Sequence, residues 1–110
     1  MPRTALTVTQ ATRAGVALPA ATAGDVANGN SVANNGRVIL LVTNTNASTT
    51  ARTITFNTVR TVDGLTAPER VESIPAGETQ LFGPFDPTDY GPSLAIDPEH
   101  AEVTIQAIRV

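Results

Sequence analysis

The 110-residue chain contains no cysteine, no lysine and no tryptophan, and it has one histidine and one tyrosine. Without cysteine, neither a disulfide bond nor a thiolate metal site can form. All seven basic residues are arginine, whose guanidinium suits interfaces with carboxylates, although a GC-rich genome would produce the same bias. The few aromatic rings disfavour a carbohydrate-binding module, because such modules stack sugars on exposed rings.

The sequence also lacks long apolar runs and an excess of basic charge. No run approaches the roughly twenty residues that cross a bilayer, and the N-terminus does not have the apolar segment of a secretory signal. The net charge of −3 argues against a nucleic-acid binder, which needs a basic stripe. We therefore expect neither a membrane nor a nucleic acid as partner, and synthesis in the cytoplasm.

The charges are unevenly distributed along the chain. Residues 1–62 have a net charge of +4, whereas residues 63–110 have a net charge of −7. Such a division could orient the protein on a charged partner or between its own copies. Alternatively, strands from the two halves could interleave in the fold, so that the folded surface would not show this division of charge.

The chain lacks the parts of a catalytic or metal site. His100 is the single histidine, and no nucleophile motif such as G-x-S-x-G accompanies it. The densest group of metal-ligating residue types is Asp86, Asp89, Asp97, Glu99 and His100. These residues do not have the spacing of a calcium loop, and aspartate before proline ordinarily starts a turn. We expect no enzymatic activity, no cofactor and no metal.

Frequent turn signals separated by short runs rich in threonine, valine and isoleucine are the main positive feature. The turn signals are Asn35-Gly36, residues 44–48, Asp63-Gly64, Pro75-Ala76-Gly77, Gly83-Pro84 and Asp97-Pro98. This spacing predicts a single all-β domain, an antiparallel two-sheet β-sandwich of immunoglobulin-like or jelly-roll-like type. No segment has helical periodicity, and residues 86–92 are predicted to form a loop.

Several strands can be predicted individually. Residues 38–42 are apolar on both faces, which predicts a central strand covered on both sides. Residues 52–62 predict a long strand, with a bulge near Asn57-Thr58 because Val59 has the opposite parity to Phe56. Shorter strands are predicted at 70–74, 79–82 and 93–96. A last strand is predicted at 101–110. Ile108 has the opposite parity to Val103 and Ile105, so this strand would need a bulge or an edge twist to bury all three.

Residues 1–34 differ in composition from the rest. Thr4–Thr9 alternates like a half-buried strand, but residues 11–35 are rich in small and polar residues. We interpret 1–34 as an N-terminal strand with an arm or long loop, including a short strand near Gly15–Leu18, and 35–110 as the sandwich body. Deletion of residues 2–13 would then weaken assembly and leave a cooperative melt.

Phe85 and Tyr90 flank a proline-rich loop. Aromatic residues are enriched where partners bind, so both are candidate contacts with a capsid or another subunit. An equally favoured interpretation is that Phe85 plugs the end of the sandwich core.

The ordered motifs resemble a family of small head proteins of tailed bacteriophages, especially those that infect actinobacteria. The resemblance rests on residues 3–9, Asn35-Gly36-Arg37 leading to Leu40, Val42 and Asn44, residues 53–56 and 61–65, Ile74-Pro75-Ala76-Gly77, Gly83-Pro84-Phe85 and Tyr90. It spans nearly the whole chain and implies a β-sandwich located on the virion.

The resemblance implies a decoration, or cement, protein on the outer surface of the capsid. Its partners would be the major capsid protein and copies of itself, arranged as a trimer. Arg3 and Arg13 of the basic half are candidate contacts with carboxylates on the shell. Two alternatives remain: a head-to-tail joining or tail protein, and a ligand- or glycan-binding β-module.

Overall fold

The computed structural model describes residues 3–59, 61–66 and 68–110, and most of its regular structure is β-strand. The strands are β1 (Thr4–Ala5), β2 (Val8–Gln10), β3 (Thr22–Ala23), β4 (Asn30–Ala33), β5 (Val38–Asn44), β6 (Arg52–Asn57), β7 (Thr61–Val62), β8 (Leu65–Thr66), β9 (Arg70–Ile74), β10 (Thr79–Phe82), β11 (Ser93–Pro98) and β12 (Val103–Arg109). One short helix, α1 (Pro87–Tyr90), lies where we predicted a loop.

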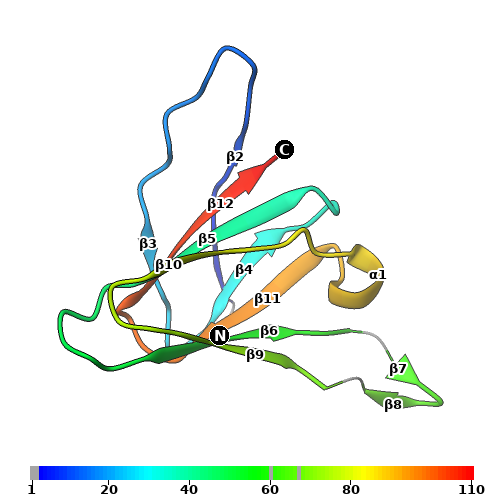
Figure 1. Cartoon of the computed structure of the whole chain (residues 1–110). Coiled ribbons are helices and arrows are strands. Elements are labelled where there is room, and N and C mark those ends of the chain that lie inside the picture. The colour runs from blue at the N-terminus through cyan, green and yellow to red at the C-terminus, as the bar shows by residue number, and fades with distance from the viewer. Residues whose placement is uncertain (1–2, 60, 67) are drawn as a thin grey trace.

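Two sheets pack against each other as the predicted β-sandwich (Figure 1). Sheet A has the order β1-β4-β11-β6-β9. Sheet B has the order β10-β5-β12-β2, and β3 also pairs with β12. The expectation of antiparallel pairing holds for most pairs, including the edge strands β9 and β10, but β1 runs parallel to β4 and β2 runs parallel to β12. These parallel pairs arise because the N-terminal strands are added to the margins of both sheets.

Strand β5 has the central position that its apolar sequence predicts, between β10 and β12. Its burial alternates: Val38, Leu40 and Val42 are buried, whereas Ile39 and Leu41 are only partly buried. The expectation of cover on both sides is therefore wrong. In a two-layer sandwich only the inner face of a sheet meets the other sheet, so apolar residues on the outer face stay accessible.

Part of the 1–34 segment belongs to the sandwich. Strand β4 lies inside sheet A between β1 and β11, and its Val32 is 1% exposed. Leu6 is 8% exposed in the core. The strand expected near Gly15–Leu18 is absent from this described region, which forms a loop. The interpretation as an arm or long loop therefore applies only to residues 11–21. We call these residues the projecting loop.

The expected bulges are not needed. Strand β6 ends at Asn57, where its pairing with β11 also ends, so Val59 lies outside the sheet and is 57% exposed. Thr61–Val62 forms a separate hairpin with Leu65–Thr66 through Asp63-Gly64, where both residues have positive φ; Arg60 lies outside the described residues. Strand β12 pairs with β5 without interruption through Ile108, whose side chain simply faces outward.

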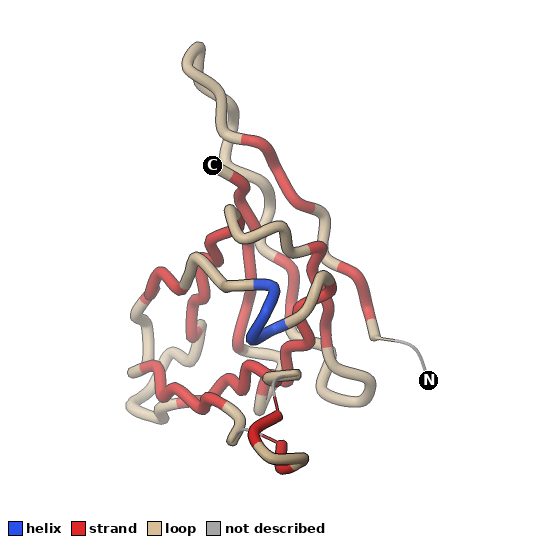
Figure 2. The backbone as a smooth tube through the Cα atoms, turned by 90° about the vertical axis from the view of Figure 1, so that its right-hand side faces the viewer, coloured by secondary structure: helices blue, strands red, loops and turns tan. Residues whose placement is uncertain are grey.

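The projecting loop extends beyond the sandwich, as Figures 1 and 2 show from two directions. The Cα radius of gyration is 14.0 Å, slightly above the roughly 13 Å expected for a compact chain of this length. No helix in the described part of the chain is long and apolar enough to span a membrane.

Candidate functional site

An aromatic cluster closes one end of the sandwich core. The ring of Phe56 lies 5.2 Å from that of Phe82 and 5.0 Å from that of Phe85, between ring centroids. Tyr90 meets Phe85 edge-on at 5.1 Å. Phe85 is 4% exposed, so it plugs the core as the second of our two interpretations proposed. Tyr90 is partly exposed and can still meet another molecule.

Helix α1 positions Tyr90 over this cluster. Asp86 caps the helix by accepting a hydrogen bond from the Thr88 amide, and proline occupies the first helical position. The helix ends at Gly91, which has a φ of +82°. This turn chemistry explains why a segment with two prolines and a glycine contains one helical turn instead of an irregular loop.

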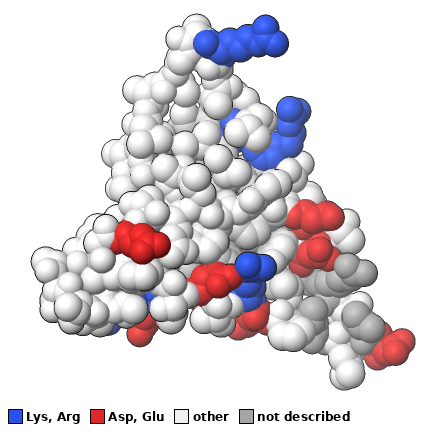
Figure 3. Space-filling view, in the orientation of Figure 1, with Lys and Arg blue, Asp and Glu red and all other residues white. Residues whose placement is uncertain are grey.

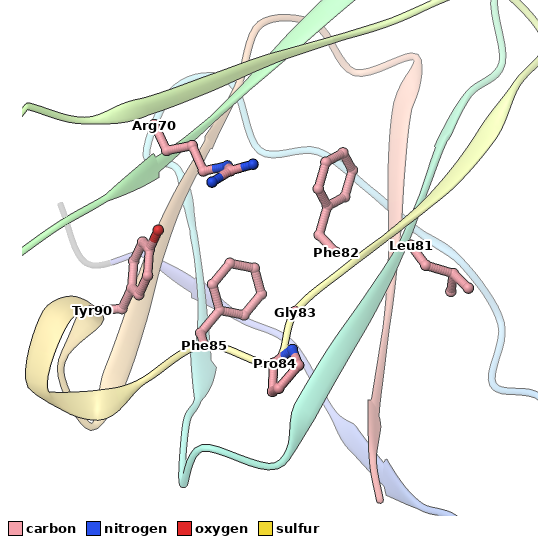
Figure 4. A pocket seen from close by; sticks show the side chains of 7 residues that line it. All are labelled: Arg70, Leu81, Phe82, Gly83, Pro84, Phe85 and Tyr90. Atoms are coloured by element: carbon pink, nitrogen blue, oxygen red, sulfur yellow. The ribbon is translucent and has the colours of Figure 1, made fainter.

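Beside the rings lies an open pocket of about 270 Å³. It is lined by Arg70, Leu81, Phe82, Gly83, Pro84, Phe85 and Tyr90. In Figure 4 the guanidinium of Arg70 and the hydroxyl of Tyr90 lie on the same side of the Phe85 ring. The pocket sits between the edge strands β9 and β10, which diverge toward α1 (Figure 1).

Gly83 allows this arrangement because it brings the end of β10 close to β5. Its φ is +118°, and a Cβ atom there would lie 2.8 Å from the Val38 carbonyl oxygen. A residue with a side chain would therefore be strained and would collide with backbone. Glycine lets the chain turn from Phe82 toward Phe85 along the pocket.

The structure assigns Arg3 a role inside the molecule. Its Nη1 atom donates to Asp97 Oδ1 at 2.6 Å and to the Ile96 carbonyl oxygen at 3.1 Å. The hydrogen bond from Arg3, together with one from Asn57, holds the pKa of Asp97 below its ordinary value against the effect of partial burial. Arg3 thus ties the N-terminal strand to β11, and its contact with a capsid stays a prediction.

Arg13 is different, because it lies on the projecting loop and is exposed. Within the described residues it makes no ion pair. Exposed Val16 and Leu18 follow it in the same loop, at 50% and 59% exposure. The loop is held to sheet B by the side chain of Gln106, which donates to the Pro19 carbonyl oxygen at 2.6 Å. Of the sequence-predicted residues, only Phe85 and Tyr90 are brought together, and Arg13 is far along the chain from both.

The outer face of sheet B carries no charged side chain at its described outward positions. They are Ile39, Leu41, Thr43, Thr79, Leu81, Thr104, Gln106 and Ile108, as the register of β10, β5 and β12 places them. Leu81 is 67% exposed beside Leu41, and Thr43 and Thr79 share a hydrogen bond of 2.7 Å. A hollow of about 270 Å³ between Ile108 and the projecting loop continues this uncharged surface. Sequence analysis missed this face because it took both sides of 38–42 to be covered.

Basic and acidic residues are separated in space along β5, as they are along the sequence. Arg37 and Arg109 flank its first residues near the projecting loop, whereas Glu78 and Glu102 adjoin its last residue. Figure 3 shows only basic side chains at the upper end of the molecule, whereas the lower half carries the acidic side chains together with some basic ones. The predicted asymmetry is partly neutralised by ion pairs between the halves, Arg3 with Asp97 and Arg52 with Glu102.

Several of the residues that could have bound a metal make other contacts. Asp86 caps α1, Asp97 pairs with Arg3, and His100 Nδ1 accepts a hydrogen bond from the Glu102 amide. The Asn46 amide and then Arg52 hold the pKa of Glu102 below its ordinary value. Throughout the described ranges, no three histidine, aspartate or glutamate side chains are grouped so that they could hold a metal ion.

Comparison of the chain with protein-family models, with curated proteins and with solved structures found no match.

Proposed function

We propose that this protein is a structural component of a virion, a decoration protein that binds the outer surface of a tailed-bacteriophage head and stabilises it. The observation that carries the proposal is the uncharged outer face of sheet B, which the projecting loop extends. Contiguous exposed apolar surface commonly marks a site of protein–protein contact, and this face combines exposed Leu81 with partly buried Ile39, Leu41 and Ile108. The phage head as partner comes from the resemblance of the ordered sequence motifs.

The outer face offers a broad, shallow contact area rather than a cleft. Leu81 and the loop residues Val16 and Leu18 would supply apolar contacts, and the threonines of β5, β10 and β12 would supply hydrogen bonds at the rim. Many copies on one shell would multiply a modest affinity for each contact with the major capsid protein. A trimer at a threefold or quasi-threefold axis is the arrangement that we expect.

The polarity of charge suggests how the protein would be oriented. Arg13 would meet carboxylates on the shell at one margin of the docked face, and Glu78 would lie near the opposite margin. Attraction between exposed charges is screened by salt, so binding should weaken at high ionic strength without being abolished.

The test is to mix the purified protein with capsids that lack it and to measure copy number and resistance to heat. We expect many copies per head, higher resistance to heat and no turnover of substrates. Saturation at a few copies confined to one vertex would instead indicate a head-to-tail joining protein. Absence of binding at low salt, combined with tight binding of a glycan, would overturn the proposal in favour of a ligand-binding module.

A pair of variants separates the proposed face from the rest of the surface. Leu81→Asp places a charge on the outer face of sheet B, and Val71→Asp places one on the outer face of sheet A, where Val71 is 57% exposed. Capsid occupancy should fall at least tenfold for Leu81→Asp and stay near the wild-type value for Val71→Asp. Equal loss in both variants would contradict the assignment of this face.

A further inference from the structure

The pocket between β9, β10 and α1 combines an apolar floor with unused hydrogen-bond donors. Partly buried Phe82 supplies accessible ring surface, Phe85 backs the pocket at 4% exposure, and Gly83-Pro84 forms one wall. The rings of Phe56 and Tyr90 hold Phe85 from two sides, so the floor is fixed by packing before any ligand arrives. A pre-formed floor lowers the entropy cost of binding.

Two polar groups lie at the mouth of this pocket. Arg70 donates through Nε to Glu72 at 2.8 Å, and its two terminal nitrogens have no partner within the described residues. The Tyr90 hydroxyl has none there either, and Figure 4 shows it directed to the same side as the guanidinium. A guanidinium fork and a phenol hydroxyl side by side can both donate to one carboxylate.

We propose that this pocket binds a carboxylate carried on an apolar body about the size of one aromatic side chain. The apolar body packs on Phe82 and Pro84, and the carboxylate accepts hydrogen bonds from Arg70 and Tyr90. The volume of about 270 Å³ is at the lower limit of small-molecule sites, so the ligand is a single residue or a molecule of similar size. Leu81 belongs both to the lining of this pocket and to the outer face of sheet B, and its side chain points away from the aromatic rings in Figure 4.

The charges at the mouth favour a monoanion. One guanidinium is present, and the carboxylate of Glu72 already contacts it. A second negative charge on the ligand would be left without a cation and close to that carboxylate, which is unfavourable. A carboxylate is therefore a better match than a phosphate.

N-Acetylphenylalanine and its neutral amide are matched probes for this site. Tyr90 is the sole tyrosine in a chain without tryptophan, so intrinsic fluorescence reports directly on the pocket. We expect the acid to change Tyr90 emission with a Kd on the order of 1 mM. The acid should bind more tightly than the amide because its carboxylate can pair with Arg70. The preference should be only about fivefold, because Arg70 is exposed and water screens the ion pair.

Variants and a second probe complete the test. Arg70→Gln should reduce the affinity for the acid to that for the amide, whereas Arg37→Gln, at an exposed arginine that does not line the pocket, should change neither affinity. An acetylated tripeptide ending in phenylalanine distinguishes the sources: if it binds like the single residue, a protein C-terminus can enter the pocket, and if it does not, the ligand is a small molecule. Equal affinities for the acid and the amide would overturn the proposal. So would the absence of any change in Tyr90 emission at concentrations of the acid well above about 1 mM.

Discussion

At the scale of single residues, buried asparagines connect loops to the sandwich. Asn44 is fully buried and donates to the carbonyl oxygens of Thr50 and Ile74, at 3.0 and 2.9 Å. Asn34 donates to the Gly91 carbonyl oxygen at 3.1 Å. Buried amides with satisfied hydrogen bonds stabilise one loop geometry, because any rearrangement leaves polar groups unpaired. Sequence analysis had placed Asn44 in a turn signal and Asn34 in the N-terminal arm or long loop, without a buried role for either.

The ion pair of Arg3 with Asp97 predicts a dependence of stability on pH. The pKa of Asp97 is lowered on folding, so the stabilising contribution is complete above the unfolded pKa of about 3.8 and is lost as pH falls through the folded value. Both side chains are about a third to a half exposed, so we expect only about 0.2–1 kcal/mol.

Thermal melts of the wild type and of Asp97→Asn can measure this contribution. The wild type should melt a few degrees higher at about pH 7, and the difference should shrink at about pH 3. A difference that is the same at both values of pH would show that the charge of Asp97 is not responsible.

At the scale of elements, strand β5 contributes alternate side chains to the core and to the outer face of sheet B. Leu40 is fully buried and Leu41 is partly exposed on the opposite face of the same strand. Leu40→Ala should lower the free energy of unfolding by about 2–5 kcal/mol, because it leaves a cavity between the sheets. Leu41→Ala is the matched control and should lower the free energy of unfolding by clearly less. Urea denaturation of both variants measures the difference, and a loss below about 0.5 kcal/mol for Leu40→Ala would remove this residue from the core.

At the scale of the whole molecule, the N-terminal residues complete both sheets. β1 extends sheet A, β2 extends sheet B, and Leu6 between them is buried. This finding reverses our expectation for deletion of residues 2–13, which we now expect to lower the melting temperature markedly. Burial of Leu6 alone contributes about 2 kcal/mol, in addition to the contacts of Arg3.

Replacement of residues 14–18 by glycine and serine provides the control for that deletion. These loop residues are exposed, so the melting temperature should stay close to that of the wild type while capsid binding weakens. Calorimetry of both variants distinguishes the two effects. A deletion variant that melts like the wild type would restore the interpretation of a dispensable arm.

The sequence by itself determined the all-β class, most strand positions and several turns. These features depend on neighbouring residues: Asp63-Gly64 forms its turn through local φ preferences, and the alternation in 103–107 needs only the period of a strand. The tertiary structure decided which residues meet. Arg3 pairs with Asp97, and Arg70 lines the same pocket as Tyr90, but no local pattern in the sequence specifies either juxtaposition. Whether an apolar side chain such as Leu41 or Phe85 is covered depends on the other layer of the sandwich, so the accessible face of sheet B and the aromatic pocket emerge only when the two sheets pack.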